Sequence, residues 1–315
     1  MQVNNLSQFK PKLKIDSQDI LSSNNFDGRG ARPIANSAII KFINDSLKFD
    51  YLYDDKILPT FLDTYYEWIQ KSKLNEFHGL NKFNKLDYVH GTSQCFDFFF
   101  LKNKNRRMRC FRGDFAYHKI SWKNYFHNGW QFIEDDELHE NDCFVVSVPF
   151  SDSGGLHPKT EDILKKCDNL KIPVLIDSAY YSIAGGIKID LDRPCIDTIT
   201  FSLSKPFYGA ERLRIGMRCC KEFQDDTINF CNEFQQINRL GAGVGNDLCN
   251  NFHTDFNYQN FRKMQIKLCS QLNIEPTNTV IFGQASKDHK DFGHYDRGSI
   301  YKRVCISKLL GDCNQ

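Results

Sequence analysis

Short apolar runs alternate with amphipathic stretches through the middle of the chain. Five of these runs end at polar or turn-forming residues and predict strands: Leu86–His90, Met108–Arg112, Cys143–Val148, Ile172–Ile176 and Asp197–Phe201. Between the third and fourth lies HPKTEDILKKCDNLK, in which Thr160 is expected to cap a helix with acidic residues in its first turn. Strand, helix and strand at this spacing predict an α/β domain with a mostly parallel sheet.

The pattern changes beyond Lys221. Two helical stretches, EFQDDTINFCNEFQQINRL and FRKMQIKLCSQL, precede two short predicted strands, Asn278–Phe282 and Ile300–Ile306. We therefore expect a large domain over residues 51–218 and a smaller α+β domain over residues 219–315. Residues 1–50 are expected to form an N-terminal arm and part of the small domain.

Composition and charge exclude several classes of protein. The 315 residues are 41% hydrophobic, which suffices for a large domain with a satellite. A net charge of +2 gives no bulk electrostatic case for binding nucleic acid or a membrane surface. The N-terminus lacks a signal-peptide core, and the 12 cysteines include no C-x-x-C pair. These features predict a cytoplasmic protein with reduced thiols, no metal site and no membrane span.

Polar residues follow four of the predicted strands. The segments are Gly91–Gln94, Pro149–Gly154, Asp177–Tyr180 and Ser202–Lys205. In parallel α/β sheets, ligands bind beyond the carboxyl ends of the strands. The sequence therefore predicts one site at this edge of the sheet.

The stretch TFSLSKPFYGAERLRIG, residues 200–216, carries a family likeness. With I-D-S-A-Y at residues 176–180, it resembles the fold-type I enzymes that depend on pyridoxal phosphate. The resemblance is to the class I/II aminotransferases, and within them to the histidinol-phosphate aminotransferase-like branch. It spans Tyr53 to Ser307 and is strongest from Val148 to Gly216. It implies a mostly parallel central sheet with helices on both faces, a small domain, and a homodimer with its active site near the interface. Because only 99 residues follow Gly216, the small domain is expected to be reduced relative to the family.

The resemblance implies three catalytic residues. Lys205, in S-L-S-K-x-F, matches the lysine that forms a Schiff base with the cofactor aldehyde and later moves a proton. Asp177 matches the carboxylate that pairs with the pyridine nitrogen and keeps it protonated. Tyr180 matches the tyrosine whose hydroxyl bonds the cofactor's 3′ oxygen, with Tyr181 as a competing candidate.

The phosphate group would be held by two turns and an arginine. The turn residues are Gly91, Thr92, Ser93, Ser202 and Ser204. Backbone N–H groups at a helix N-terminus and hydroxyl groups suit a dianion. Arg214, in R-I-G, resembles the family's phosphate arginine. It stands one residue later than in the usual pattern, so Arg212 is an alternative.

Three further residues complete the predicted site. Phe115, in GDFAYH, aligns with the aromatic residue that stacks on the pyridine ring, with Tyr117 and His118 as neighbouring candidates. Tyr53 resembles the tyrosine that crosses the dimer interface to the neighbour's phosphate. Arg303, in K-R-V-C-I-S, occupies the place of the arginine that binds the substrate α-carboxylate.

The chain departs from the family between Val148 and Gly154. Where the family has N-P-x-N-P-T-G, this chain has V-P-F-S-D-S-G. Ser151 thus replaces the asparagine that bonds the cofactor's 3′ oxygen, and Asp152 follows it. The change leaves the reaction type open.

The sequence therefore predicts a homodimeric aminotransferase with an amine donor and a keto acceptor. One alternative is a lyase, decarboxylase or cyclase that uses the same cofactor and fold. A second alternative is an inactive protein that retains the fold and serves only in binding.

Overall fold

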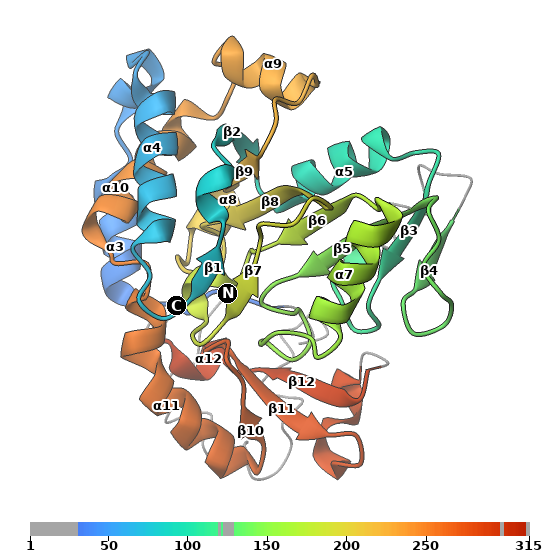
Figure 1. Ribbon diagram of the computed structural model, residues 1–315. Coiled ribbons are helices and arrows are strands. Elements are labelled where there is room, and N and C mark those ends of the chain that lie inside the picture. The colour runs from blue at the N-terminus through green and yellow to red at the C-terminus, as the bar shows by residue number, and fades with distance from the viewer. Residues whose placement is uncertain (1–30, 119–120, 122–128, 297–298, 313–315) are drawn as a thin grey trace.

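A seven-stranded sheet forms the centre of the protein. The computed structural model describes residues 31–118, 121, 129–296 and 299–312, and the sheet order is β2-β9-β8-β6-β5-β3-β4 (Figure 1). Its strands are β2 (Lys85–His90), β3 (Arg107–Cys110), β4 (Trp130–Phe132), β5 (Asp142–Ser147), β6 (Val174–Asp177), β8 (Ile196–Ser202) and β9 (Ile215–Cys220). Only β9 is antiparallel to its neighbours, β2 and β8. The predicted α/β class with a mostly parallel sheet is confirmed.

Helices cover both faces of this sheet because the central strands are apolar on both sides. In β5, Phe144 and Val146 belong to the core beneath α7 (Thr160–Leu170), whereas Cys143 and Val145 belong to the core beneath α5 (Thr92–Lys102). This alternation follows from the two-residue period of a strand. Thr160 does not cap α7 as expected. It is the first helical residue, and Lys159 stands at the cap position without a side-chain bond.

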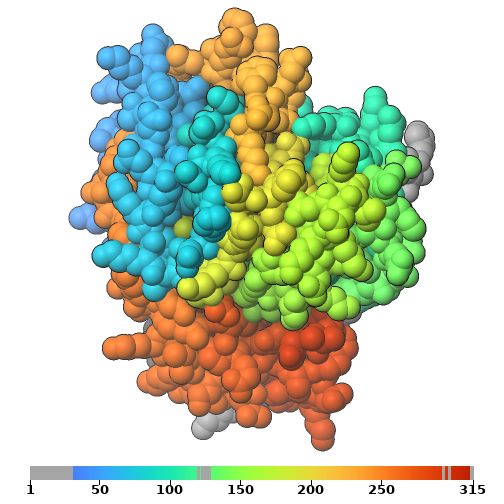
Figure 2. All heavy atoms as spheres, viewed as in Figure 1, coloured from blue at the N-terminus to red at the C-terminus, as the bar shows by residue number. Residues whose placement is uncertain are grey.

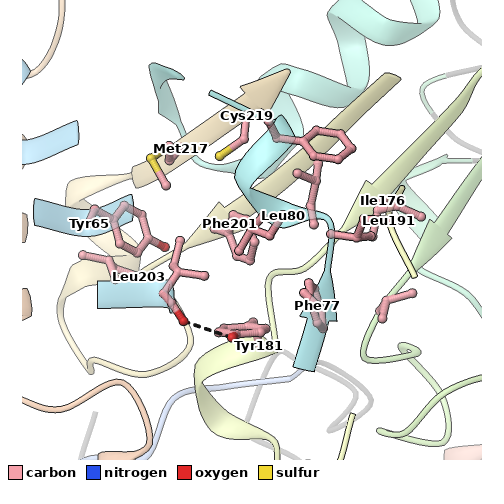
Figure 3. Packing of buried hydrophobic residues seen from close by; sticks show 14 of the residues in the cluster. Tyr65, Phe77, Leu80, Ile176, Tyr181, Leu191, Phe201, Leu203, Met217 and Cys219 are labelled. Carbon is pink, nitrogen blue, oxygen red and sulfur yellow. Dashed lines mark hydrogen bonds between the residues drawn. The ribbon is translucent and has the colours of Figure 1, made fainter. Parts of the chain in front are cut away.

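The face of the sheet beneath α7 continues into a helical layer. It contains α4 (Ile57–Gln70), α10 (Arg239–Asn251), α3 (Ser37–Asp45) and the short helices η1 (Phe49–Tyr53) and α8 (Ala210–Leu213), while α9 (Thr227–Glu233) lies at the β2 edge (Figure 1). Figure 3 shows the core of this part of the protein, in which Tyr65 of α4 and Phe201 and Met217 of the sheet are buried. A separate parallel pair, β1 (Glu76–His78) and β7 (Lys188–Asp190), lies outside the main sheet.

The C-terminal part forms a second, antiparallel sheet. It consists of β10 (Glu275–Pro276), β11 (Phe282–Ser286) and β12 (Tyr301–Cys305), with α11 (Phe256–Leu272) and α12 (Ser307–Leu310). The space-filling view shows this part, orange to red, packed directly against the rest of the molecule (Figure 2). The predicted strand over Asn278–Phe282 is wrong in position. Gln265 donates to the carbonyls of Thr277, Thr279 and Phe282 and so stabilises a turn in this segment. The strand therefore begins only at Phe282.

The expected domain boundary at residue 218 falls inside β9. Beyond it, Ala242, Val244 and Leu248 of α10 belong to the core of the large sheet, whereas Leu268 and Leu272 of α11 belong to the core of the second sheet. By packing, the second unit therefore begins at α11. Residues 1–30, the start of the expected N-terminal arm, lie outside the described residues. No helix in the described ranges is long and apolar enough to cross a membrane.

A buried arginine fixes the β3–β4–β5 side of the sheet. Arg109 has no exposed surface and donates to Asp142 Oδ2 at 2.6 Å and to the carbonyls of Glu137 at 2.6 Å and Phe132 at 3.0 Å. Burial would raise the pKa of Asp142, but hydrogen bonds from Arg107, from the His139 backbone and from Arg109 hold it below its ordinary value. The charge pair is thus satisfied on both sides, as a buried pair requires.

We expect Arg109→Met to lower the free energy of unfolding by about 3 kcal/mol, because Asp142 and several buried carbonyls would lose a donor. Urea denaturation measures this change. Arg112→Met is the matched control, since Arg112 pairs with Asp135 at the surface and its removal should cost at most about 1 kcal/mol. Equal losses in the two variants would contradict the structural role of Arg109.

Candidate active site

A cavity of about 740 Å³ opens at the carboxyl ends of β3, β5, β6 and β8. It brings together most of the residues predicted from the sequence: Gly91, Thr92, Ser93, Phe115, Ser151, Asp177, Tyr180, Ser204, Lys205, Arg214 and Arg303. Ser202 and Tyr53 do not line it. The strand-end argument therefore located the cavity correctly.

Asp177 is the last residue of the central strand β6 and is buried. The hydrogen bonds it accepts in the described structure, from Ala179 N at 3.1 Å and Thr200 Oγ1 at 3.5 Å, both go to Oδ1. Oδ2 is thus left for a donor on a ligand. Burial, and then the charge of Asp114, raise the pKa of Asp177 to about 7, although the Ala179 N–H and Lys205 oppose this shift. A cationic N–H group in the cavity would remove much of this cost.

Lys205 lies in the turn that follows β8. Its Nζ donates to the carbonyl of Ala31 at 2.9 Å and lies 5.9 Å from the centre of the Tyr180 ring. The side chain is partly buried and lines the cavity, so its amine is available to a carbonyl compound bound there.

Gly91 and Arg214 form one end of the cavity together with the N-terminus of α5. Gly91 precedes this 11-residue helix with φ +77°, and a Cβ at this position would collide with the Arg214 guanidinium. Arg214 Nη2 donates to Ser93 Oγ and to the His90 carbonyl, both at 3.1 Å. Backbone N–H groups, a hydroxyl and a guanidinium therefore converge where a dianion could bind.

Two serines support the same end of the cavity. Ser204 lines it, whereas Ser202 is buried behind it and bonds Ser204 Oγ at 2.7 Å. Ser202 Oγ also accepts a hydrogen bond from Ser204 N at 3.1 Å. Ser202 therefore orients Ser204 within this turn.

The structure distinguishes the paired tyrosines and the paired arginines by position. Tyr180 lines the cavity, whereas Tyr181 lies in the large core between Phe77 and Phe201 and donates to the Ile69 carbonyl at 3.0 Å (Figure 3). Arg214 lines the cavity, whereas the Arg212 side chain is 81% exposed and does not. Position therefore favours Tyr180 and Arg214 as the site residues.

Aromatic residues form the wall that follows β3. Phe115 lines the cavity with 41% of its surface exposed, and its ring stacks on that of Tyr117 at 5.9 Å. Tyr117 also lines the cavity, whereas His118 is buried behind Phe115. Phe115 thus presents a flat apolar surface to a ligand.

Arg303 of β12 reaches the cavity from the second sheet. It is buried, lies 4.4 Å from the centre of the Phe282 ring, and donates from Nη1 to the carbonyl of Ser151 and, at 3.4 Å, to its hydroxyl. Ser151, which replaces the family asparagine, is therefore attached to the predicted substrate arginine. Sequence reasoning did not anticipate this link, because it joins segments more than a hundred residues apart.

Some groups of the wall were missed from the sequence, and three of them make polar contacts that matter here. Asp114 and Ser147 line the cavity beside Asp177, and Ala31 contributes the carbonyl that accepts from Lys205. Asp114 is buried and sits directly before Phe115 in GDFAYH, so a charged residue beside a predicted ring-stacking position was the available signal. No such signal marked Ser147 or Ala31.

These residues fit pyridoxal phosphate. The Gly91–Arg214 end suits its phosphate, Oδ2 of Asp177 can accept from its ring nitrogen, and Lys205 supplies an amine to the same cavity. No group of three or more His, Cys, Asp or Glu side chains among the described residues has a metal-binding arrangement.

Solved structures resemble the protein at low sequence identity. Kynurenine aminotransferase from Pyrococcus horikoshii matches with a TM-score of 0.65 and 12% identity, covering 99% of this chain and 93% of that chain. L-threonine-O-3-phosphate decarboxylase from Porphyromonas gingivalis gives 0.62 and 15%, covering 88% and 94%. Histidinol-phosphate aminotransferase from Clostridium acetobutylicum gives 0.56 and 14%, covering 84% and 81%. These likenesses show the fold, and the histidinol-phosphate branch stays a prediction.

The family itself follows from the sequence match. No curated protein matches the chain significantly. The profile of the family described as aminotransferase class I and II matches residues 104–283, more than half of the chain. That segment contains Asp177, Lys205 and Arg214, which line one cavity. This protein belongs to the class I and II aminotransferase family.

Proposed function

We propose that this protein is a pyridoxal-phosphate-dependent aminotransferase that acts on an amino acid or an amino-acid-like amine. The observation that carries the proposal is the shared cavity of Lys205, Asp177 and Arg214. When bound, the cofactor supplies an aldehyde that condenses with amines and a ring that withdraws electrons from the substrate α-carbon.

The Gly91–Arg214 end of the cavity would hold the phosphate. The guanidinium of Arg214, the hydroxyls of Ser93 and Ser204 and the N–H groups at the start of α5 would donate to its oxygens. Because Gly91 lacks a side chain, the backbone can approach the anion closely.

The ring would lie against Phe115, with Asp177 accepting from its nitrogen. A carboxylate at this atom stabilises positive charge on the nitrogen, which is the state that withdraws electrons most strongly. Tyr180 is proposed to donate to the ring's 3′ oxygen. Ser151, whose hydroxyl is held by Arg303, would take the place of the family asparagine at the same oxygen.

Lys205 would serve as nucleophile and then as base. Its Nζ would be the amine that holds the cofactor through its aldehyde, and the same Nζ, once free, would accept the proton from the substrate Cα. Arg303 would bind the substrate carboxylate. A buried guanidinium supported by Phe282 and Ser151 is well placed to orient a planar carboxylate.

A second copy of this chain would complete the phosphate site. Tyr53 does not line the cavity of its own chain, and 83% of its surface is exposed. An exposed tyrosine beside the similarly exposed Phe49 supports a role at a subunit interface, where Tyr53 would reach the neighbour's phosphate.

The decisive experiment is an amino-donor screen on protein loaded with pyridoxal phosphate, followed by the cofactor absorbance and by product analysis. Transfer predicts a keto acid and the amine form of the cofactor. Carbon dioxide release would instead favour decarboxylation, a candidate because one structural neighbour is a decarboxylase and Ser151 replaces the asparagine. Bound cofactor that responds to no amine would support an inert binding protein.

Lys205→Ala should abolish covalent attachment of the cofactor and lower turnover at least about a hundredfold, because the nucleophile and base are lost. Borohydride reduction followed by peptide mass spectrometry locates the attachment. Lys221→Ala is the control, since Lys221 is partly buried and lies outside the cavity. Label at another lysine in the wild type would refute this assignment.

Arg214→Gln should weaken cofactor binding at least about tenfold, because a charged hydrogen-bond donor to the phosphate is lost. Equilibrium titration of the apoprotein measures the affinity. Arg212→Gln removes an exposed arginine two residues away and should leave the affinity unchanged. The reverse ranking would assign the phosphate to Arg212.

Asp177 should make the stability of the cofactor-free protein depend on pH. Because its pKa is raised from 3.8 to about 7, its stabilising contribution is complete below about pH 4 and is lost as pH rises through about 7. The unfolding free energy of the wild type should therefore fall relative to that of Asp177→Asn as pH increases.

Asp168→Asn provides the control of opposite sign. Burial would raise the pKa of Asp168, but hydrogen bonds from Cys195 and Arg193 lower it, so its contribution is lost as pH falls. Urea denaturation at several pH values measures both differences. A wild-type minus Asp177→Asn difference that does not change with pH would contradict the expectation.

A further inference from the structure

Two buried carboxyl groups line the same wall of the cavity. Asp177 ends β6, and its register partner on β5 is Ser147. Ser147 donates to Asp114 through its hydroxyl at 2.5 Å and through its backbone N–H at 3.1 Å. Asp114, on the loop after β3, is therefore fixed to the residue beside Asp177, and both side chains are at least nine-tenths buried.

The two carboxyl groups differ in the donors they receive. Asp114 accepts from Ser147 N, Ser147 Oγ and, at 2.7 Å, Phe115 N, and three such donors stabilise an ionised carboxylate. Asp177 accepts from one backbone N–H and from a hydroxyl at 3.5 Å. Because two adjacent buried carboxylates repel each other, the negative charge is favoured on Asp114 and a proton is favoured at Asp177.

Other charged and titratable groups also face this pair. Lys205 opposes proton uptake by Asp177, while burial lowers the pKa of His157 to about 4 and raises that of Cys95 well above its ordinary value. His157 and Cys95 are therefore neutral near pH 7. Among the residues that the structure describes, the other cations that line the cavity are Arg214 and Arg303. Asp114 is thus an anion on this wall whose charge opposes these cations at Asp177.

We propose that Asp114 is a positioning residue whose fixed negative charge keeps a proton in the unit formed by Asp177 and the cofactor's ring nitrogen. The inference rests on the proposed function, because it requires the ring nitrogen to face Asp177. Asp114 touches neither the substrate nor the reacting atoms in this role. It acts through Asp177 and stabilises the protonated ring electrostatically.

The test follows the ring nitrogen directly by ¹⁵N NMR of protein loaded with ¹⁵N-labelled pyridoxal phosphate, titrated with pH in the absence of substrate. In Asp114→Asn, the midpoint at which the nitrogen loses its proton should fall by at least about one pH unit, a tenfold loss of proton affinity. Asp114→Ser also lacks the charge and should give the same shift, which covers the case in which the asparagine variant does not fold.

Two further variants separate the possible outcomes. Asp97→Asn removes a carboxylate that accepts a hydrogen bond from Tyr117 but does not itself line the cavity. This variant should leave the midpoint unchanged. Asp177→Asn should lower the midpoint most, which shows that the signal reports this site. Wild-type midpoints in both Asp114 variants would overturn the inference while leaving the proposed function intact. Failure of the wild type to bind the cofactor would overturn both.

Discussion

The register of three neighbouring parallel strands is the constraint on which the site depends. Ser147 of β5 pairs with Asp177 of β6, and Asp177 pairs with Thr200 of β8. Backbone hydrogen bonds therefore bring the chemical groups to one edge before any ligand arrives. A slip of one residue would turn the side chain of Asp177 to the opposite face of the sheet, which is covered by helices. The apolar residues that lock the register thus also position the carboxylate.

The parts of the site that the sequence revealed are those that depend on local order. Asp177 directly follows one apolar run, and Lys205 lies in the short polar segment after another, so strand ends placed both at the cavity. β9 was not predicted because Arg218 interrupts its apolar pattern. This arginine is buried only because Asp87 and Asp226 neutralise it from distant segments. Tyr180 was preferred to Tyr181 on the family resemblance and not on a strand end, since both tyrosines lie where β6 gives way to the short helix η3 (Tyr181–Ile183).

Some site residues depart from the family pattern, and others were overlooked in the sequence. Both kinds form hydrogen bonds with one another or with predicted site residues. Ser151 bonds Arg303, and Asp114 bonds Ser147 beside Asp177. Each contact joins segments separated by at least 33 residues, so no local pattern could reveal it. The family match identifies the family, whereas these long-range contacts are where this chain can differ from its relatives.

Arg303 belongs to the C-terminal sheet, yet its guanidinium bonds the loop that follows β5 of the large sheet. The two sheets are thus joined at the place where a substrate carboxylate would bind. A hybrid protein built by exchanging the C-terminal segment with that of a relative would therefore lose more than the arginine proposed to bind a carboxylate. It would also release the Ser151 loop, so the proposed substrate arginine and the shape of the cavity have to be inherited together.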